Sequence, residues 1–121
     1  SVEAGAYDIV LAFEMVHDLA KPQAALATMR ALGKREAIIV VMDEGVAETF
    51  EAPCENPVER LMYAASVLHC LPVGMSESPS AATGTVMRPA TLRSYASEAG
   101  FSTVDILPIE HDLFRFYQLV A

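Results

Sequence analysis

Several residue types are scarce in this sequence of 121 residues, and each shortage argues against a class of protein. The sequence has no tryptophan and only two cysteines, Cys54 and Cys70, so we expect two reduced thiols rather than a disulfide framework. There are 8 basic residues against 16 acidic ones, and the net charge of -8 opposes binding to nucleic-acid phosphates. The longest apolar run, residues 37–42, is too short to cross a membrane. No signal peptide is apparent, and we expect a cytoplasmic protein.

The remaining composition and the first half of the chain predict one domain with a substantial core. Hydrophobic residues make up 53% of the sequence and charged residues 20%, which is typical of a folded domain. The apolar runs Tyr7–Phe13 and 36–42 predict strands that are buried on both faces of a parallel sheet. Between them, Pro22 begins a helical pattern that Gly33 ends. This order predicts a parallel βαβ unit.

A second helix is predicted to begin near Asn56. Asn56 is a favourable N-cap, Pro57 suits the first helical position, and Glu59 occupies the position of a capping-box acid. The expected apolar face consists of Val58, Leu61, Met62, Ala65 and Leu68. Prolines, glycines and small residues interrupt the pattern over residues 71–87, which predicts a long irregular segment that either binds or covers a ligand or is disordered.

The last third of the chain predicts one helix and two strands. The helix covers residues 89–99, and Gly100 ends it. The strands cover residues 102–109 and 112–120 and are expected to form an antiparallel pair. We assign no chemistry to the acidic turn around His111 that joins them. The complete predicted order is β-α-β-α-α-β-β.

Three segments of the sequence together carry a family resemblance. They are YDIVLAFEMVHDLAKPQAAL (7–26), EAIIVVMDE (36–44) and MRPATLRSYASEAGF (87–101). In this order they resemble the C-terminal half of Rossmann-like (class I) S-adenosylmethionine-dependent methyltransferases of the small-molecule type. They are similar to the fourth strand with its turn, the fifth strand with its acidic exit, and the late helix before the sixth strand. The resemblance implies an α/β fold with a parallel pair and a terminal antiparallel hairpin, S-adenosylmethionine as cofactor, and a small-molecule methyl acceptor.

The sequence departs from this family in its glycines. The family binds its cofactor mainly through a glycine-rich loop in the first half of the fold, because glycines let the backbone approach the ligand. Here the six glycines are scattered, and no two lie within nine residues of each other. We therefore expect residues 1–121 to form a single partial methyltransferase domain, inactive alone and without tight binding of S-adenosylmethionine.

A partial domain of this kind has consequences for assembly. The strand Tyr7–Phe13 is expected to become a free apolar edge, and such an edge favours a homodimer. The alternative to a methyltransferase fragment is a non-catalytic α/β module for dimerisation or regulation. A hydrolase or metal-binding α/β domain built on the acidic and histidine residues is a third hypothesis.

The turn after the first strand contains the first candidate site residues. Ligands of open α/β sheets bind beyond the C-terminal ends of the parallel strands. By resemblance, Phe13, Glu14 and Met15 lie beside the cofactor. His17 is the candidate general base near the acceptor. Alternatively, His17 and Asp18 only help to start the following helix.

The second strand end and the long loop contain the candidate acceptor residues. Asp43 could bind the substrate beside Glu44, and the alternative is a solvated acidic loop. If the second helix and the loop cover the pocket, His69, Cys70 and Met75 would line it; the alternative for His69 and Cys70 is a structural role. We expect no metal site, because no Cys/His spacing typical of zinc occurs.

Overall fold

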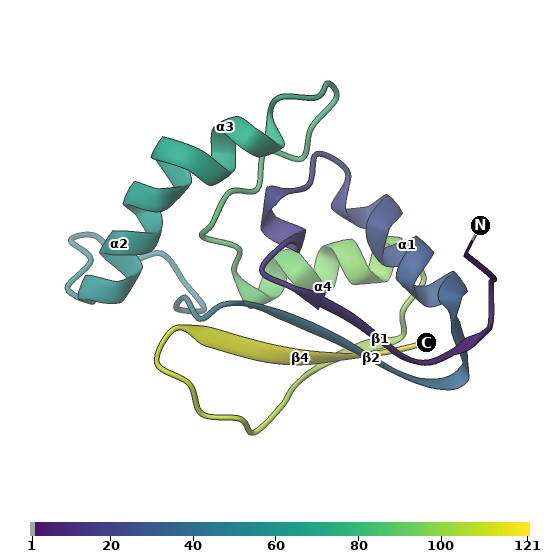
Figure 1. The fold of residues 1–121 in the computed structure, drawn as a ribbon. Coiled ribbons are helices and arrows are strands. Elements are labelled where there is room, and N and C mark those ends of the chain that lie inside the picture. Colours follow the sequence, from purple (N-terminus) through teal and green to yellow (C-terminus); the bar gives the residue numbers. More distant parts are fainter. Residues whose placement is uncertain (1) are drawn as a thin grey trace.

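The computed structural model describes residues 2–121 and places one mixed sheet beneath a layer of helices (Figure 1). In chain order the elements are β1 (Tyr7–Phe13), the 3₁₀ helix η1 (Val16–Asp18), α1 (Pro22–Leu32), β2 (Gly33–Glu44), α2 (Pro57–Ala65), the π-helix η2 (Ser66–Cys70), α3 (Leu71–Gly74), α4 (Pro89–Glu98), β3 (Thr103–Ile106) and β4 (Phe114–Val120). This confirms the order of strands and main helices expected from the sequence. Within residues 2–121, no helix has both the length and the apolar character needed to cross a bilayer.

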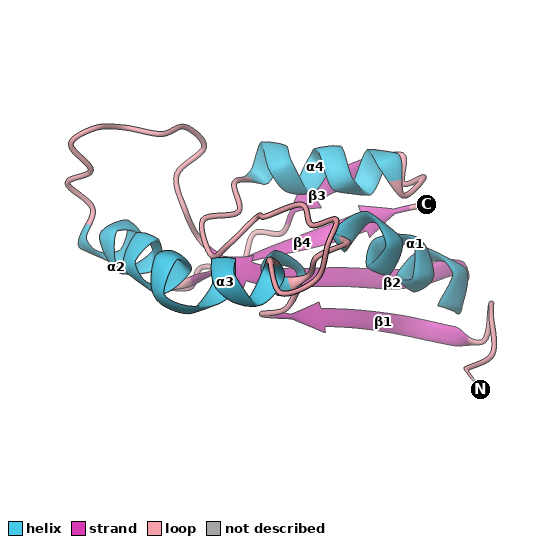
Figure 2. Ribbon diagram, turned by 90° about the horizontal axis from the view of Figure 1, so that it is seen from above, coloured by secondary structure: helices cyan, strands magenta, loops and turns pink. Residues whose placement is uncertain are grey.

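The sheet has the strand order β1-β2-β4-β3, which Figure 2 shows from above. β1 and β2 are parallel, with Ile9 opposite Ile38 and Phe13 opposite Met42. β4 runs antiparallel to both β2 and β3. The predicted parallel pair and terminal hairpin are therefore confirmed, and β1 is an edge strand with a neighbour on one side only.

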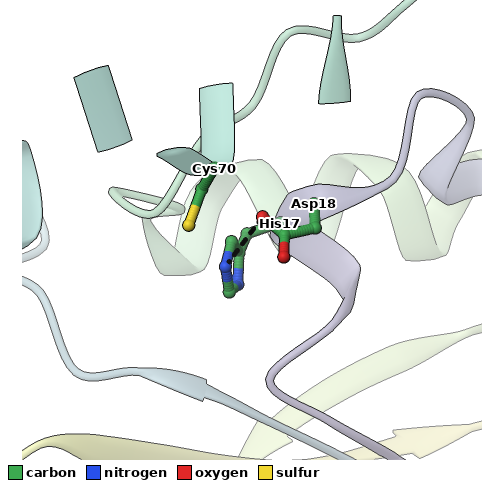
Figure 3. Close-up of side chains that lie close together, drawn as sticks. All are labelled: His17, Asp18 and Cys70. Atoms are coloured by element: carbon green, nitrogen blue, oxygen red, sulfur yellow. Dashed lines mark ion pairs between the residues drawn. The ribbon is translucent and has the colours of Figure 1, made fainter. Parts of the chain in front are cut away.

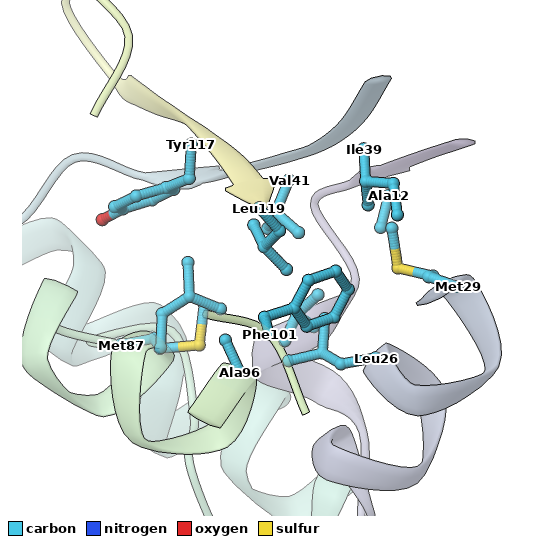
Figure 4. Close-up of a cluster of buried hydrophobic side chains, with 12 residues drawn as sticks. Ala12, Leu26, Met29, Ile39, Val41, Met87, Ala96, Phe101, Tyr117 and Leu119 are labelled. Carbon is cyan, nitrogen blue, oxygen red and sulfur yellow. The ribbon is translucent and has the colours of Figure 1, made fainter. Parts of the chain in front are cut away.

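The hydrophobic core lies between the sheet and the helices α1 and α4 (Figure 4). Leu26 of α1 and Leu92 of α4 are fully buried, as the helical spacing of their apolar residues predicts. Gly100 ends α4 with a φ of 90°, a conformation that glycine adopts without strain. The strands contribute Ala12, Ile39, Val41, Tyr117 and Leu119.

The prediction that the first two strands are buried on both faces is wrong. Successive side chains of a strand point to opposite faces, and in Figure 1 the helices lie on one side of the sheet. Ala12 therefore enters the core, whereas Ile9, Leu11 and Phe13 point away from the helices, and Leu11 is 54% exposed. Ile38 of β2 continues this apolar face. We call the set Tyr7, Ile9, Leu11, Phe13 and Ile38 the bare sheet face.

The start of α2 confirms one predicted cap and corrects another. The side chain of Asn56 accepts hydrogen bonds from the backbone N–H groups of Val58 (2.9 Å) and Glu59 (3.4 Å), as an N-cap should. Glu59 forms no capping box. Its carboxylate instead accepts a hydrogen bond from the backbone N–H of Ala47 at 3.0 Å and pairs with Arg88.

The helix that begins at α2 is longer than the sequence predicts and turns differently. It continues through η2 and α3 into the segment expected to be irregular. Pro72 has no N–H to donate to the carbonyl of Leu68, and this missing bond accounts for the wider π-helical turn before it. The prediction of the apolar face is wrong in part. Met62 is buried as expected, but Leu61 and Leu68 are exposed, and the exposed fraction of Leu68 is 82%.

Candidate functional site

The candidate site lies where the parallel strands β1 and β2 end. After Phe13, Glu14 adopts a φ of 50° and donates its backbone N–H to the carbonyl of Met42 at 2.9 Å. The chain then leaves the sheet and forms η1, whose second residue is His17. Because parallel strands end at the same edge of the sheet, this turn brings His17 next to the last residues of β2.

Three buried ionisable side chains meet at this edge. His17 Nδ1 lies 2.5 Å from Asp43 Oδ1 and 3.1 Å from Glu44 Oε2. The exposed fractions of His17, Asp43 and Glu44 are 3%, 1% and 7%. The backbone N–H of Glu44 also donates to Asp43 Oδ1 at 3.1 Å. The structure thus joins the histidine and the strand-end acids that the sequence marked separately, and it excludes a solvated loop at Asp43.

The pKa values of these groups depend on one another. Burial alone would lower the pKa of His17, but hydrogen bonds and charge from Asp43 and Glu44 outweigh it and raise the pKa from 6.5 to about 11. Burial raises the pKa of Asp43 to about 7, although His17 partly opposes this shift. Burial would also raise the pKa of Glu44, but the bond from His17 prevails and lowers it to about 2. The cluster therefore holds an imidazolium, an ionised Glu44 and a carboxyl group that titrates near neutral pH.

The cluster carries more negative than positive charge. Asp18, which follows His17, places its Oδ1 atom 3.2 Å from His17 Nε2 on the other side of the ring. Three buried carboxylate oxygens lack a well-aligned hydrogen bond. Two of them, Asp18 Oδ1 and Glu44 Oε2, are ion-paired with His17, whereas Asp43 Oδ2 has no partner of either kind among the described residues. Among the residues that the structure describes, His17 is the only cationic side chain that forms an ion pair with these acids. Buried carboxylates without partners are costly, so this arrangement favours the binding of a cation.

The π-helix η2 brings a fourth group to His17 (Figure 3). Its last residue, Cys70, is a buried free thiol, and Cys54 is also free, as the sequence predicts. The Sγ atom of Cys70 and ligand atoms of His17 and Asp18 all lie within 4.8 Å of one another. The contact depends on close approach of the following turn, because a Cβ on Gly74 would lie only 3.3 Å from the backbone oxygen of Asp18.

The side chain of Arg88 forms hydrogen bonds that connect the segment after Glu44 to the helical layer. Its guanidinium donates to the carbonyl of Ala47 (2.6 Å), to the carboxylate of Glu59 (3.0 Å) and to the hydroxyl of Tyr63 (2.7 Å). These bonds connect the exit of β2 to α2 and to the residue that precedes α4. The role of Arg88 could not be predicted from the sequence, because nothing in its neighbours along the chain indicates a partner as distant as Glu59.

The other predicted site residues lie outside the buried cluster. Their side chains are exposed, and Phe13 belongs to the bare sheet face. Their predicted contacts with cofactor and acceptor stay predictions. The residues concerned are Phe13, Glu14, Met15, His69 and Met75.

The strand order and helical layer define an α/β protein with the Rossmann-like methyltransferase fold, as comparison with solved structures shows. The trans-methyltransferase CalH in complex with SAH has a TM-score of 0.65 and 21% identity, covering 100% of this chain and 32% of its own. A putative O-methyltransferase from Nostoc punctiforme PCC 73102 has a TM-score of 0.61 and 20% identity, covering 97% and 33%. The CurJ carbon methyltransferase has a TM-score of 0.64 and 15% identity, covering 99% and 31%.

These likenesses confirm the fold class expected from the sequence. The chain spans only about a third of the length of each of these structures (32%, 33% and 31%). At 21% identity or less, the comparison shows the fold alone. No protein-family model and no curated protein matches the sequence.

Proposed function

We propose that this chain is the C-terminal portion of an S-adenosylmethionine-dependent methyltransferase that acts on a small-molecule acceptor. The observation that carries the proposal is the buried cluster of His17, Asp43 and Glu44 at the C-terminal ends of the parallel strands. Open α/β sheets bind their ligands at this edge. The fold supports the proposal, since a similar methyltransferase was solved in complex with SAH. The net charge of -8 favours a small molecule over a nucleic acid as acceptor.

In this proposal His17 takes up the proton of the acceptor. Methyl transfer from a sulfonium requires an in-line geometry and, for many acceptors, a base. Asp43 and Glu44 engage Nδ1, so Nε2 is the ring atom left for the acceptor, which would have to displace the Asp18 carboxylate now 3.2 Å away. Asp43 and Glu44 stabilise the imidazolium that forms. His17 must first release its own proton, and the positive sulfonium of a bound cofactor would lower its pKa and so promote that release.

The remaining contacts of the proposed site come from the exposed turn and the helix that follows α2. Phe13, Glu14 and Met15 would contact the cofactor, and His69 and Met75 would contact the acceptor when the rest of the protein covers them. The scattered glycines and the bare sheet face support a missing cofactor-binding half that covers this face. We therefore expect the 121-residue chain alone to bind S-adenosylmethionine weakly and to be inactive.

Calorimetry with S-adenosylmethionine tests the proposal on two proteins. One is the 121-residue chain, and the other is the longest protein that its gene encodes. We expect no tight binding to the former and clear binding to the latter. Tight binding to the shorter chain would show that it contains the cofactor site. A gene whose start codon directly precedes the codon for Ser1 would refute the proposal that a cofactor-binding half is missing.

The role of His17 is tested in the longer protein. We expect His17→Gln to reduce kcat by about 100-fold to 10,000-fold while cofactor binding persists, because proton transfer contributes that much. His111→Gln is the matched control, since His111 lies in the exposed turn before β4 and should leave kcat unchanged. Equal rates for the His17 variant and the wild type would exclude the proposed base.

A homodimer is the second part of the proposal. It is also expected of one form of the alternative, a non-catalytic dimerisation module, although not of a regulatory module. The observation that favours it is the exposed apolar edge strand Tyr7–Phe13. Sedimentation of the 121-residue chain should show a dimer, and Leu11→Lys on the bare sheet face should shift it toward monomer. A wild-type chain that stays monomeric at high concentration would contradict this assembly.

A further inference from the structure

The two ring nitrogens of His17 face different sets of groups. Nδ1 is held by Asp43 and Glu44, as described above. Nε2 faces the carboxylate of Asp18 at 3.2 Å and the thiol of Cys70 (Figure 3). The second set combines the three ligand types that zinc takes in proteins: imidazole nitrogen, thiolate sulfur and carboxylate oxygen.

The distances suit a tetrahedral cation. Zinc binds nitrogen and carboxylate oxygen at about 2.0–2.2 Å, and tetrahedral angles then place these two atoms roughly 3.3 Å apart. The observed separation between His17 Nε2 and Asp18 Oδ1 is 3.2 Å. Cys70 Sγ lies within 4.8 Å of the other ligand atoms, and a Zn–S bond of about 2.3 Å at tetrahedral angles requires roughly 3.6 Å to the nitrogen, so Cys70 would complete three ligands by moving closer. The fourth position is left for water.

The electrostatics of the cluster also favour a cation at this point. Asp18 Oδ1 is buried and has no hydrogen-bond partner, although it faces the imidazole. Asp43 accepts the bond from Nδ1 on the opposite side of the ring. A carboxylate in this position orients a metal-binding histidine and makes its free nitrogen a stronger ligand.

We propose that His17 Nε2, Asp18 Oδ1 and Cys70 Sγ bind zinc or a similar thiophilic divalent cation, with Asp43 as the outer carboxylate that orients the imidazole. Binding releases two protons to solvent, one from Nε2 of the imidazolium and one from the Cys70 thiol, because only the neutral imidazole and the thiolate are ligands. The sequence predicts no metal site because the ligands lie on two distant segments and meet only through η1 and η2. A cation on Nε2 excludes proton uptake at the same atom. Zinc should therefore inhibit methyl transfer, and this consequence alone rests on the proposed function.

The binding test uses the purified 121-residue chain, kept reduced with a phosphine and stripped of metal. Zinc chloride is titrated by calorimetry, and cobalt(II) chloride is titrated as a spectroscopic probe. We expect one zinc per chain and an ultraviolet charge-transfer band that reports a cobalt–thiolate bond. Absence of that band would overturn the proposal, because a site without Cys70 is not the one described.

Variants separate this site from adventitious metal binding. Cys70→Ala should abolish the thiolate band, and Asp43→Asn should weaken zinc binding by about 10-fold to 100-fold, as loss of an outer carboxylate does. Cys54→Ala is the matched control, because Cys54 is the other free thiol and should leave the band intact. A band that survives in Cys70→Ala and disappears in Cys54→Ala would refute the assignment. Circular dichroism establishes that each variant is folded.

Activity of the longer protein keeps the two proposals apart. Methyl transfer measured without metal tests the proposed function, whereas zinc binding to the 121-residue chain needs no cofactor. If methyl transfer is present, added zinc should inhibit it, and Cys70→Ala should remove the inhibition. Inhibition of equal strength in Cys70→Ala would show that zinc acts elsewhere.

Discussion

The contact between Gly84 and Ser66 allows a quantitative test of how the π-helix is held over the candidate site. Gly84 has a φ of 72°, and a Cβ atom at this position would lie 2.2 Å from Ser66 Oγ. The same Oγ accepts a hydrogen bond from the backbone N–H of Thr85 at 3.1 Å. Ser66 begins η2, and Cys70 ends it. A side chain at position 84 must therefore displace the hydroxyl that connects the loop to this helix.

The expected cost of Gly84→Ala has two parts. A left-handed backbone conformation costs a residue with a Cβ about 1–2 kcal/mol. Displacing the Ser66 hydroxyl leaves the buried N–H of Thr85 without its acceptor, which costs about 1–3 kcal/mol. Together they predict a loss of about 2–5 kcal/mol in the free energy of unfolding.

Urea unfolding followed by far-ultraviolet circular dichroism measures this loss. Gly5→Ala is the matched control, because Gly5 has a φ of 65° and no atom within 4 Å of an added Cβ. It should show only the backbone cost of about 1–2 kcal/mol. In Ser66→Ala the hydrogen bond is already lost, so the double variant Ser66→Ala/Gly84→Ala should cost less than the sum of the two single variants.

Two results would refute this reasoning. One is a loss for Gly84→Ala no larger than that for Gly5→Ala, which would mean that the Ser66 contact carries no energy. The other is strict additivity in the double variant, because residues that share one clash and one hydrogen bond should be coupled.

Three further predictions concern the charged cluster, the ion pair and the helix cap. The pKa of His17 is raised from 6.5 to about 11 in the folded state, so its contribution to stability is complete below pH 6.5 and is lost as the pH rises toward 11. Between these pH values the urea midpoint of His17→Gln should therefore fall less than that of the wild type. Arg88→Met leaves Glu59 buried without its partner and should lower the free energy of unfolding by about 3–5 kcal/mol. The exposed Arg93→Met should cost at most about 1 kcal/mol in the same urea series. Asn56→Ala removes the N-cap of α2 and should cost about 1 kcal/mol, measured as a shift in the urea midpoint, and no shift would contradict the capping role.

The main elements of the fold could be predicted because their signals are local. The apolar runs form β1 and β2, and prolines at first helical positions begin α1, α2 and α4. Asn56 caps α2 through bonds to residues two and three positions away, so neighbouring sequence alone identifies it. The parallel pair and the terminal hairpin followed from the length of the connections, since the parallel pair needs a crossover helix and the hairpin does not, whereas the pairing of β2 with β4 did not follow from them.

Burial on each face could not be predicted from an apolar run. The run Tyr7–Phe13 has the composition of a strand covered on both sides, yet a run of this kind does not show what covers it. Leu68 likewise fits the spacing of a buried helical face, but the π-helical turn near Pro72 changes the direction in which the surrounding residues point.

The candidate site could be predicted in part, for a topological reason. His17 and Asp43 follow or end neighbouring parallel strands, and such ends meet whatever the details of the loops. Arg88 could not be found in this way, and Cys70 could be expected near the pocket only on the condition that the second helix covers it. Each reaches its partners through the packing of helices on the sheet, and such packing leaves no spacing rule in the sequence.

The two faces of the sheet differ in what they carry, because the charged cluster lies on the helical side and the bare sheet face lies on the other. Asp43 points to the helical side of β2, together with Val41 and the core. His17 reaches Asp43 from η1, and Gly74 packs closely against the backbone of Asp18 in the same turn. The bare sheet face lies on the opposite side, so a segment that covers it does not need to rearrange the cluster. Under the zinc proposal, the 121-residue chain should therefore bind the cation through the same ligands as a longer protein. Under the proposed function, cofactor binding and methyl transfer need a cofactor-binding half in addition.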